Sequence, residues 1–129
     1  QQGMDKHFYS NGSFNLVQLM LYVLHQTGPA HVFLSTYSIA EDSISTLRRY
    51  VDCGNILSIR FLIDNRVRSC TSLHAKVALI SNDKWHVSIV GSQNATLNPK
   101  LERGIIHTSF NIWNFDNRIL NEAFERGTN

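Results

Sequence analysis

The sequence predicts an α/β fold in which a mixed β-sheet carries helices on both faces. A strand, a helix and a second strand follow one another between residues 31 and 64, which is the order of a parallel crossover unit. Two apolar runs on either side of a short polar turn, between residues 74 and 94, form the pattern of a hairpin. Antiparallel strands therefore join the parallel pair, and helices at both ends of the chain are available to cover the sheet.

Three helices are predicted from periodicity and end signals. The first covers residues 14–27, is apolar enough to be well buried, and ends at Gly28–Pro29. The second covers residues 40–54, with acidic residues at its start and arginines near its end. The third covers residues 114–127, where apolar residues share one helical face. These helices separate the predicted strands.

The strands are predicted from β-rich apolar runs. Residues 31–39 form a central strand and residues 56–64 its parallel neighbour. The hairpin of residues 74–94 turns through Ser81–Lys84, and residues 104–110 form a further strand. The order is therefore helix, strand, helix, strand, hairpin, strand, helix.

Length and composition fit one globular domain. We expect a single domain over residues 1–129, which is long enough to bury a core, and a native start at Met4, after Gln1–Gly3. Hydrophobic residues make up 43% and charged residues 17%, as in globular rather than disordered chains. The net charge of +2 and the pI near 8.7 fit an anionic substrate without requiring one.

The cysteines and the apolar stretches bear on the compartment. Cys53 and Cys70 are too few for a disulfide framework and lack metal-ligand spacing, so free thiols in a reducing compartment are expected. A single disulfide between them stays open. The longest apolar stretch, residues 16–24, is too short to cross a bilayer. We therefore expect a cytoplasmic protein without integral membrane association.

The hairpin begins with a histidine and a lysine two residues apart. Alternate side chains of a strand share a face, so His74 and Lys76 point the same way, about 7 Å apart. Imidazole acts as a nucleophile or a proton shuttle near neutral pH, and an ammonium neutralises a phosphate oxygen. Taken alone, such a pair is usually an edge histidine beside a surface lysine.

The other end of the hairpin makes a phosphate site the better interpretation. Gly91 allows close backbone approach at a strand end, and Ser92 and Asn94 offer hydrogen bonds to phosphate oxygens. A hairpin brings its two ends together. We therefore predict that His74, Lys76, Ser92 and Asn94 converge on one phosphate.

These residues resemble a known motif. HAK at 74–76 and GSQN at 91–94 resemble the HxK…GSxN motif of the phospholipase D-like superfamily, often called HKD proteins. The likeness extends over residues 7–126, which follow the layout of its short, single-motif bacterial nuclease branch. Glu102 falls where that branch carries a glutamate that orients the catalytic histidine. The resemblance implies a phospholipase D/nuclease-like fold and a bacterial protein.

The resemblance also implies a mechanism, that of a metal-independent phosphodiesterase acting on DNA or RNA without a cofactor. Because the family uses two motifs and this chain has one, a homodimer is implied, with two copies of His74 at one phosphate. One His74 would form a phosphohistidine, while the other would protonate the leaving oxygen. Lys76, Ser92 and Asn94 would hold the phosphate, and Glu102 would orient His74. The implied catalytic set is His74, Lys76, Asn94 and Glu102.

Two alternative functions stay open, and a departure from the family supports the first of them. Ser81 occupies the position where the family usually carries an aspartate, and Asp83 lies in the predicted turn. This departure supports a second hypothesis, a catalytically degenerate nucleic-acid-binding module of the same fold. A lipid phosphodiesterase or phosphatidyl transferase ranks third, because no lipid-binding helix or apolar loop is evident.

Arginines near the motif are candidate nucleic-acid contacts. Arg66 and Arg68 precede it in a polar loop, and Arg103 follows Glu102. A solvated loop explains Arg66 and Arg68 equally well, and Arg103 could instead pair with a surface acid. We expect structural roles for the remaining candidates, His25, His31, Trp85, His86, His107 and Trp113.

Overall fold

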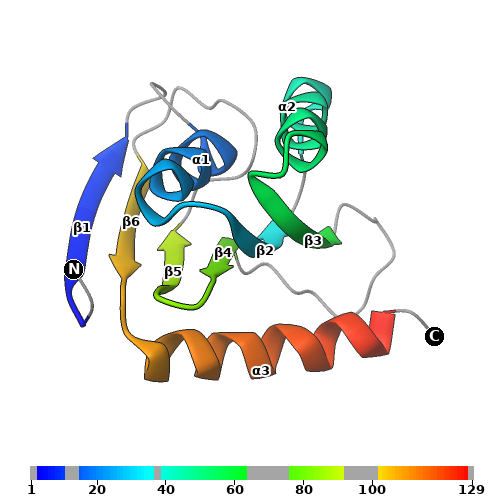
Figure 1. The fold of residues 1–129 in the computed structure, drawn as a ribbon. Coiled ribbons are helices and arrows are strands. Elements are labelled where there is room, and N and C mark those ends of the chain that lie inside the picture. Colours follow the sequence, from blue (N-terminus) through cyan, green and yellow to red (C-terminus); the bar gives the residue numbers. More distant parts are fainter. Residues whose placement is uncertain (1–2, 11–14, 37–38, 64–75, 92–101, 128–129) are drawn as a thin grey trace.

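The computed structural model describes residues 3–10, 15–36, 39–63, 76–91 and 102–127, with only the backbone of Ser10 and Glu102. These residues form one six-stranded sheet and three helices (Figure 1). The strands are β1 (Asp5–Ser10), β2 (Ala30–Thr36), β3 (Ile56–Ile63), β4 (Lys76–Ser81), β5 (His86–Gly91) and β6 (Glu102–His107). The helices are α1 (Leu16–Thr27), α2 (Glu41–Asp52) and α3 (Phe110–Gly127).

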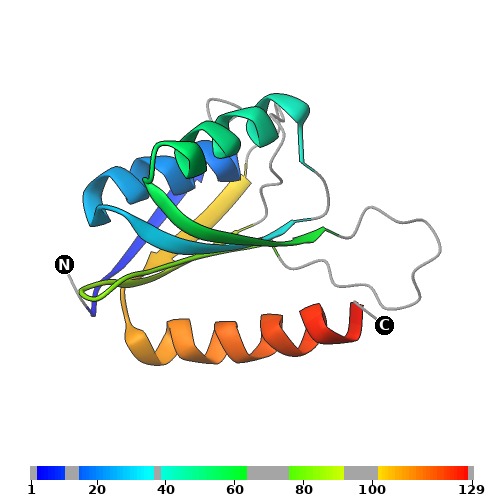
Figure 2. The same ribbon diagram turned by 45° about the vertical axis from the view of Figure 1, so that its right-hand side comes forward.

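The sheet is mixed, as the sequence predicts. Its strand order is β1-β6-β5-β4-β2-β3, in which β2 and β3 are parallel and every other neighbouring pair is antiparallel. Figure 2 shows α1 and α2 on one face of the sheet and α3 on the other. The predicted α/β class with helices on both faces is therefore confirmed.

The core consists of two apolar layers divided by the sheet. On the α1/α2 side, alternate residues of the central strands, such as Leu34 and Ile80, are fully buried against α1. On the α3 side, Phe33 and Leu79 pack with Leu120. β2 is buried on both faces, which explains its nearly continuous apolar run, and it lies between β4 and the edge strand β3.

The edge strand β1 is absent from the sequence prediction. Its six residues, DKHFYS, lack the alternation of apolar and polar residues that predicts a strand, and most of them are exposed. The strand exists because β6 pairs with it along its whole length, from Asp5 opposite His107 to Ser10 opposite Glu102. Pairing across about 100 residues leaves no local periodicity in the sequence.

Two helix starts also differ from those predicted. α1 is capped by Asn15, which exchanges the hydrogen bonds of a capping box with Gln18. α3 begins at Phe110 rather than near residue 114, because Ser109 caps it. The Ser109 hydroxyl oxygen accepts a hydrogen bond from the amide of Ile112, and its carbonyl oxygen accepts the first helical bond, from the amide of Trp113. α3 is thereby one turn longer than its apolar face indicates.

Asn82 fixes the turn of the β4–β5 hairpin. Its Oδ1 accepts hydrogen bonds from the backbone amides of Lys84 (2.9 Å) and Trp85 (2.8 Å). Its Nδ2 donates to the carbonyl oxygens of Thr27 (3.0 Å), the last residue of α1, and Pro29 (3.1 Å), two residues further on. One side chain therefore closes the turn and ties it to the neighbouring connection.

We expect Asn82→Ala to lower the free energy of unfolding by about 2 kcal/mol, since four hydrogen bonds of modest net value are lost. Asn82→Asp keeps the acceptor that closes the turn and loses the two donor bonds, so about half of that loss is expected. Urea denaturation of the three proteins measures both values. Equal stability of Asn82→Ala and the wild type would contradict this role.

Candidate active site at one end of the sheet

The strand register brings the two ends of the predicted motif together. Lys76, the first residue of β4, lies opposite Gly91, the last residue of β5. Gly91 lies opposite Gly104 of β6, and Gly104 lies opposite Phe8 of β1. These four residues form a row across four strands at one end of the sheet.

The remaining motif residues are close to this row in the sequence. His74 precedes Lys76 by two residues, and Ser92 and Asn94 follow Gly91 by one and three. All three lie outside the described residues, so the structure fixes the points from which their segments start. The backbone of Glu102 pairs with Ser10 at the same end of the sheet, two residues before Gly104.

Lys76 lies on the α1/α2 side of the sheet. Ala78 and Ile80, its alternate neighbours in β4, are buried in the α1/α2 layer, and Lys76 itself is half-buried. Ser35 pairs with Val77, so the next residue of β2, the fully buried Thr36, sits beside Lys76 on that face. Thr36 is not among the residues predicted from the sequence, although a Ser-Thr pair that ends an apolar strand is a usable signal.

Gly104 is required by close packing within the row. A Cβ atom at this position would lie 2.2 Å from the tip of the Phe8 ring, well inside van der Waals contact. Phe8 packs against the α1/α2 core and lies across the strand from Gly104. The Phe8 ring thus covers Gly104 and helps to fix the start of β6, which begins at Glu102.

Ser81 lies far from this end. It closes β4 opposite His86, five residues beyond Lys76, which is about 17 Å along a strand. Asp83 is exposed in the hairpin turn next to Ser81. The side chain at the family's aspartate position therefore lies at the opposite end of the sheet from Lys76.

Of the three candidate arginines, the described part of the chain contains Arg103. Its Nη2 lies 2.8 Å from Nδ1 of His7, and its guanidinium carbon lies 5.8 Å from the centroid of the Tyr9 ring. Arg103 thus contacts a histidine and an aromatic ring of β1. Arg66 and Arg68 lie outside the described residues.

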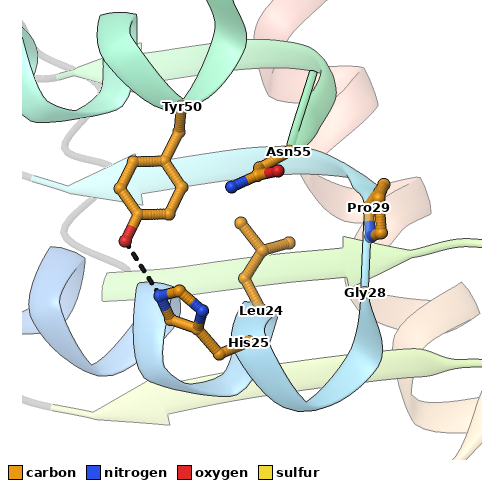
Figure 3. Close-up of a pocket in the computed structure, with 6 residues that line it drawn as sticks. All are labelled: Leu24, His25, Gly28, Pro29, Tyr50 and Asn55. Atoms are coloured by element: carbon orange, nitrogen blue, oxygen red, sulfur yellow. Dashed lines mark hydrogen bonds between the residues drawn. The ribbon is translucent and has the colours of Figure 1, made fainter. Parts of the chain in front are cut away.

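The remaining histidines have structural contacts, as expected. His25 Nε2 lies 2.9 Å from the Tyr50 hydroxyl, which links α1 and α2 at a small cavity of about 110 Å³ (Figure 3). His31 Nδ1 contacts the Ser58 hydroxyl at 2.7 Å. His86 packs edge-on against the rings of Phe110 and Trp113. His107 pairs with Asp5.

Comparison with known proteins rests on solved structures. No model of a known protein family matches the sequence, and no curated protein matches it. The phospholipase D family member Nuc from Salmonella typhimurium superposes with a TM-score of 0.68 at 12% identity, over 95% of this chain and 94% of that one. The chain has the phospholipase D-like fold.

A second solved structure agrees. NucT from Helicobacter pylori superposes with a TM-score of 0.62 at 14% identity, over 95% of this chain and 97% of that one. The phospholipase D-like fold therefore accounts for the whole sheet and all three helices.

None of the helices in the described ranges is long and apolar enough to span a membrane.

Proposed function

We propose that the protein is a metal-independent phosphodiesterase, a nuclease that hydrolyses DNA or RNA through a phosphohistidine intermediate. The observation that carries the proposal is the row Lys76–Gly91–Gly104 at one end of a phospholipase D-like sheet. The other motif residues each lie within three sequence positions of a residue in this row: His74, Ser92, Asn94 and Glu102.

The residue types fit two-step transfer at phosphorus. In the first step, a ring nitrogen of His74 bonds to phosphorus as the bond from phosphorus to the leaving oxygen breaks. A second histidine donates the proton that the leaving oxygen needs, then takes a proton from water in the second step. Lys76, Ser92 and Asn94 stabilise the extra negative charge of the five-coordinate transition state. Water releases the phosphate and restores His74.

The second histidine comes from a second copy of the chain in this proposal. The sequence contains one HxK…GSxN motif, and two histidines are needed at one phosphorus. A two-fold axis brings identical residues together, so a homodimer places His74 of each copy at a shared site. Two Lys76 ammoniums match the charge of about −2 on the transition state.

The position of Ser81 favours the enzyme over the degenerate binding module. The absence of an aspartate there was the sequence-based argument for lost activity. Ser81 is separated from Lys76 by the length of β4, about 17 Å, so it cannot contact a phosphate held at Lys76. An aspartate at this position would act on the hairpin turn rather than on the reaction.

A substrate panel in the presence of EDTA tests the proposal. We expect hydrolysis of bis-p-nitrophenyl phosphate and of single-stranded DNA or RNA, with no loss of rate when divalent ions are chelated. Rapid quenching at alkaline pH, which preserves phosphohistidine, should leave a covalent adduct on the peptide that contains His74. Turnover of phosphatidylcholine with no action on nucleic acid would support the lipid enzyme instead, and no turnover of any diester would contradict the proposal.

A further inference from the structure

A groove lies between α1 and the β1 edge of the sheet, on the α1/α2 face. Its volume is about 490 Å³, within the range of small-molecule sites. α1 packs against β4, near the middle of the sheet, while β6 and β1 lie further out, at the edge of the sheet (Figure 1). The space between this helix and the outer strands is the groove, which we call the β1–α1 groove.

The floor and one wall of the β1–α1 groove are apolar. Val87 of β5 and Ile106 of β6 belong to the floor, and Trp85, two residues before Val87, shares their face. Tyr22 and Val23 of α1 form the wall. Tyr22 is 64% exposed, so its ring is accessible to a ligand from the groove. The lining suits a ligand with an aliphatic or aromatic body.

Lys6 supplies the positive charge of the groove. It lies opposite Ile106 in the strand register, so its side chain is on the face that the groove occupies. Across the described ranges of the chain, Lys6 has no hydrogen bond and no ion pair. Asp5 also borders the groove, but its carboxylate accepts a hydrogen bond from Nδ1 of His107 at 2.8 Å. The Lys6 ammonium is therefore available to an anionic group of a ligand.

We propose that the β1–α1 groove binds a free fatty acid of medium chain length, with its carboxylate at Lys6. Burial of an alkyl chain against apolar side chains drives binding, and one ammonium matches one carboxylate. A nucleic acid carries a phosphate on every nucleotide and is bound by several lysines or arginines. A groove with one cation and an apolar floor fits the fatty acid better.

The groove is separate from the candidate active site. Val87 precedes Gly91 by four residues in β5, which corresponds to about 14 Å along the strand. Lys6 lies toward the same far end, since it pairs with Ile106 whereas Phe8 pairs with Gly104 of the row. The inference therefore goes beyond the proposed function and does not depend on hydrolysis.

A membrane surface also presents acyl chains beside negative charges. Proteins that bind anionic bilayers through charge use clusters of lysines and arginines. The groove instead has Lys6 next to Asp5 in β1. A single carboxylate on a free chain matches this arrangement, whereas a layer of anionic headgroups does not.

Displacement of the fluorescent probe anilinonaphthalene sulfonate by decanoate, or by decanol as the uncharged analogue, tests the proposal. We expect the wild type to bind decanoate about fivefold more tightly than decanol, as one partly exposed ion pair provides. Lys6→Met keeps an unbranched side chain and should remove this preference by weakening decanoate binding alone. Arg48→Met is the matched control, because it removes the same charge from the exposed side of α2.

Tyr22→Ala tests the apolar wall. Because Tyr22 is exposed, its removal leaves the core intact, and both ligands should bind about threefold or more weakly as apolar contact is lost. Tyr9→Ala is the control, since Tyr9 is 63% exposed and faces the other side of the sheet from its neighbour Phe8. Near-UV circular dichroism verifies that each variant is folded, because the probe also binds loosened chains.

Three outcomes would overturn the proposal. They are the absence of saturable decanoate binding, a preference for decanoate that persists in Lys6→Met, and binding only to vesicles that contain phosphatidylglycerol. The last would identify a membrane surface as the partner. Lys6→Met should hydrolyse bis-p-nitrophenyl phosphate at the wild-type rate. Because binding is measured without turnover, an inactive wild type would contradict the proposed function and leave the fatty-acid test intact.

Discussion

His74→Ala is expected to reduce turnover of bis-p-nitrophenyl phosphate and of single-stranded DNA by about 10³-fold or more. The substitution removes both the proposed nucleophile and, in the second copy, the proton donor. Because the imidazole forms a bond only as the reaction proceeds, kcat should fall far more than KM rises. Initial rates in EDTA over a range of substrate concentrations separate the two constants.

His31→Ala is the matched control for this experiment. His31 is exposed on the same sheet but lies opposite Ser81, at the far end from Lys76. Its removal costs the contact with Ser58 and should leave kcat within about twofold of the wild-type value, as for surface changes away from a site. If His74→Ala keeps wild-type activity, or if His31→Ala loses as much, the assignment of His74 is wrong.

Gly104→Val should lower the free energy of unfolding by about 2–3 kcal/mol, which corresponds to a fall in Tm of roughly 6–12 °C. The added Cβ would meet the Phe8 ring at 2.2 Å, and the ring can yield only by leaving its place against the α1/α2 core. The loss should exceed the small gain that a β-branched residue brings to a strand. Thermal denaturation measures the shift.

A double-mutant cycle with Phe8→Ala identifies the cause. If the ring is the obstacle, Gly104→Val should cost much less in the Phe8→Ala background, with a coupling free energy of about 1–2 kcal/mol. Independent losses that simply add would indicate that valine strains the backbone of β6 instead. Because Gly104 belongs to the same row as Lys76 and Gly91 and lies two residues from Glu102, the single variant should also slow diester hydrolysis below its Tm.

Local periodicity accounts for what the sequence predicts correctly about the fold. The apolar face of α1, the acidic start and basic end of α2 and the two halves of the hairpin are each visible within about 20 residues. The same locality explains why the two ends of the hairpin meet as predicted, with Lys76 opposite Gly91 in the structure, since a hairpin closes on itself. Signals of this kind need no knowledge of the rest of the chain.

The errors have one physical origin. β1 is recognised only through its pairing with β6, and the start of α3 at Phe110 depends on a cap at Ser109 rather than on the apolar face. In each case, contacts from a distant or flanking segment override the local pattern.

The sequence alone therefore determined the α/β class and the order of the elements that follow β1, because both are written in short-range spacing. Only the tertiary structure decided which residues meet across strands. The row from Phe8 to Lys76, the separation of Ser81 from that row, and the contact of Tyr9 with Arg103 all depend on strand register. Register joins residues up to about 100 positions apart and is fixed by packing over the whole sheet.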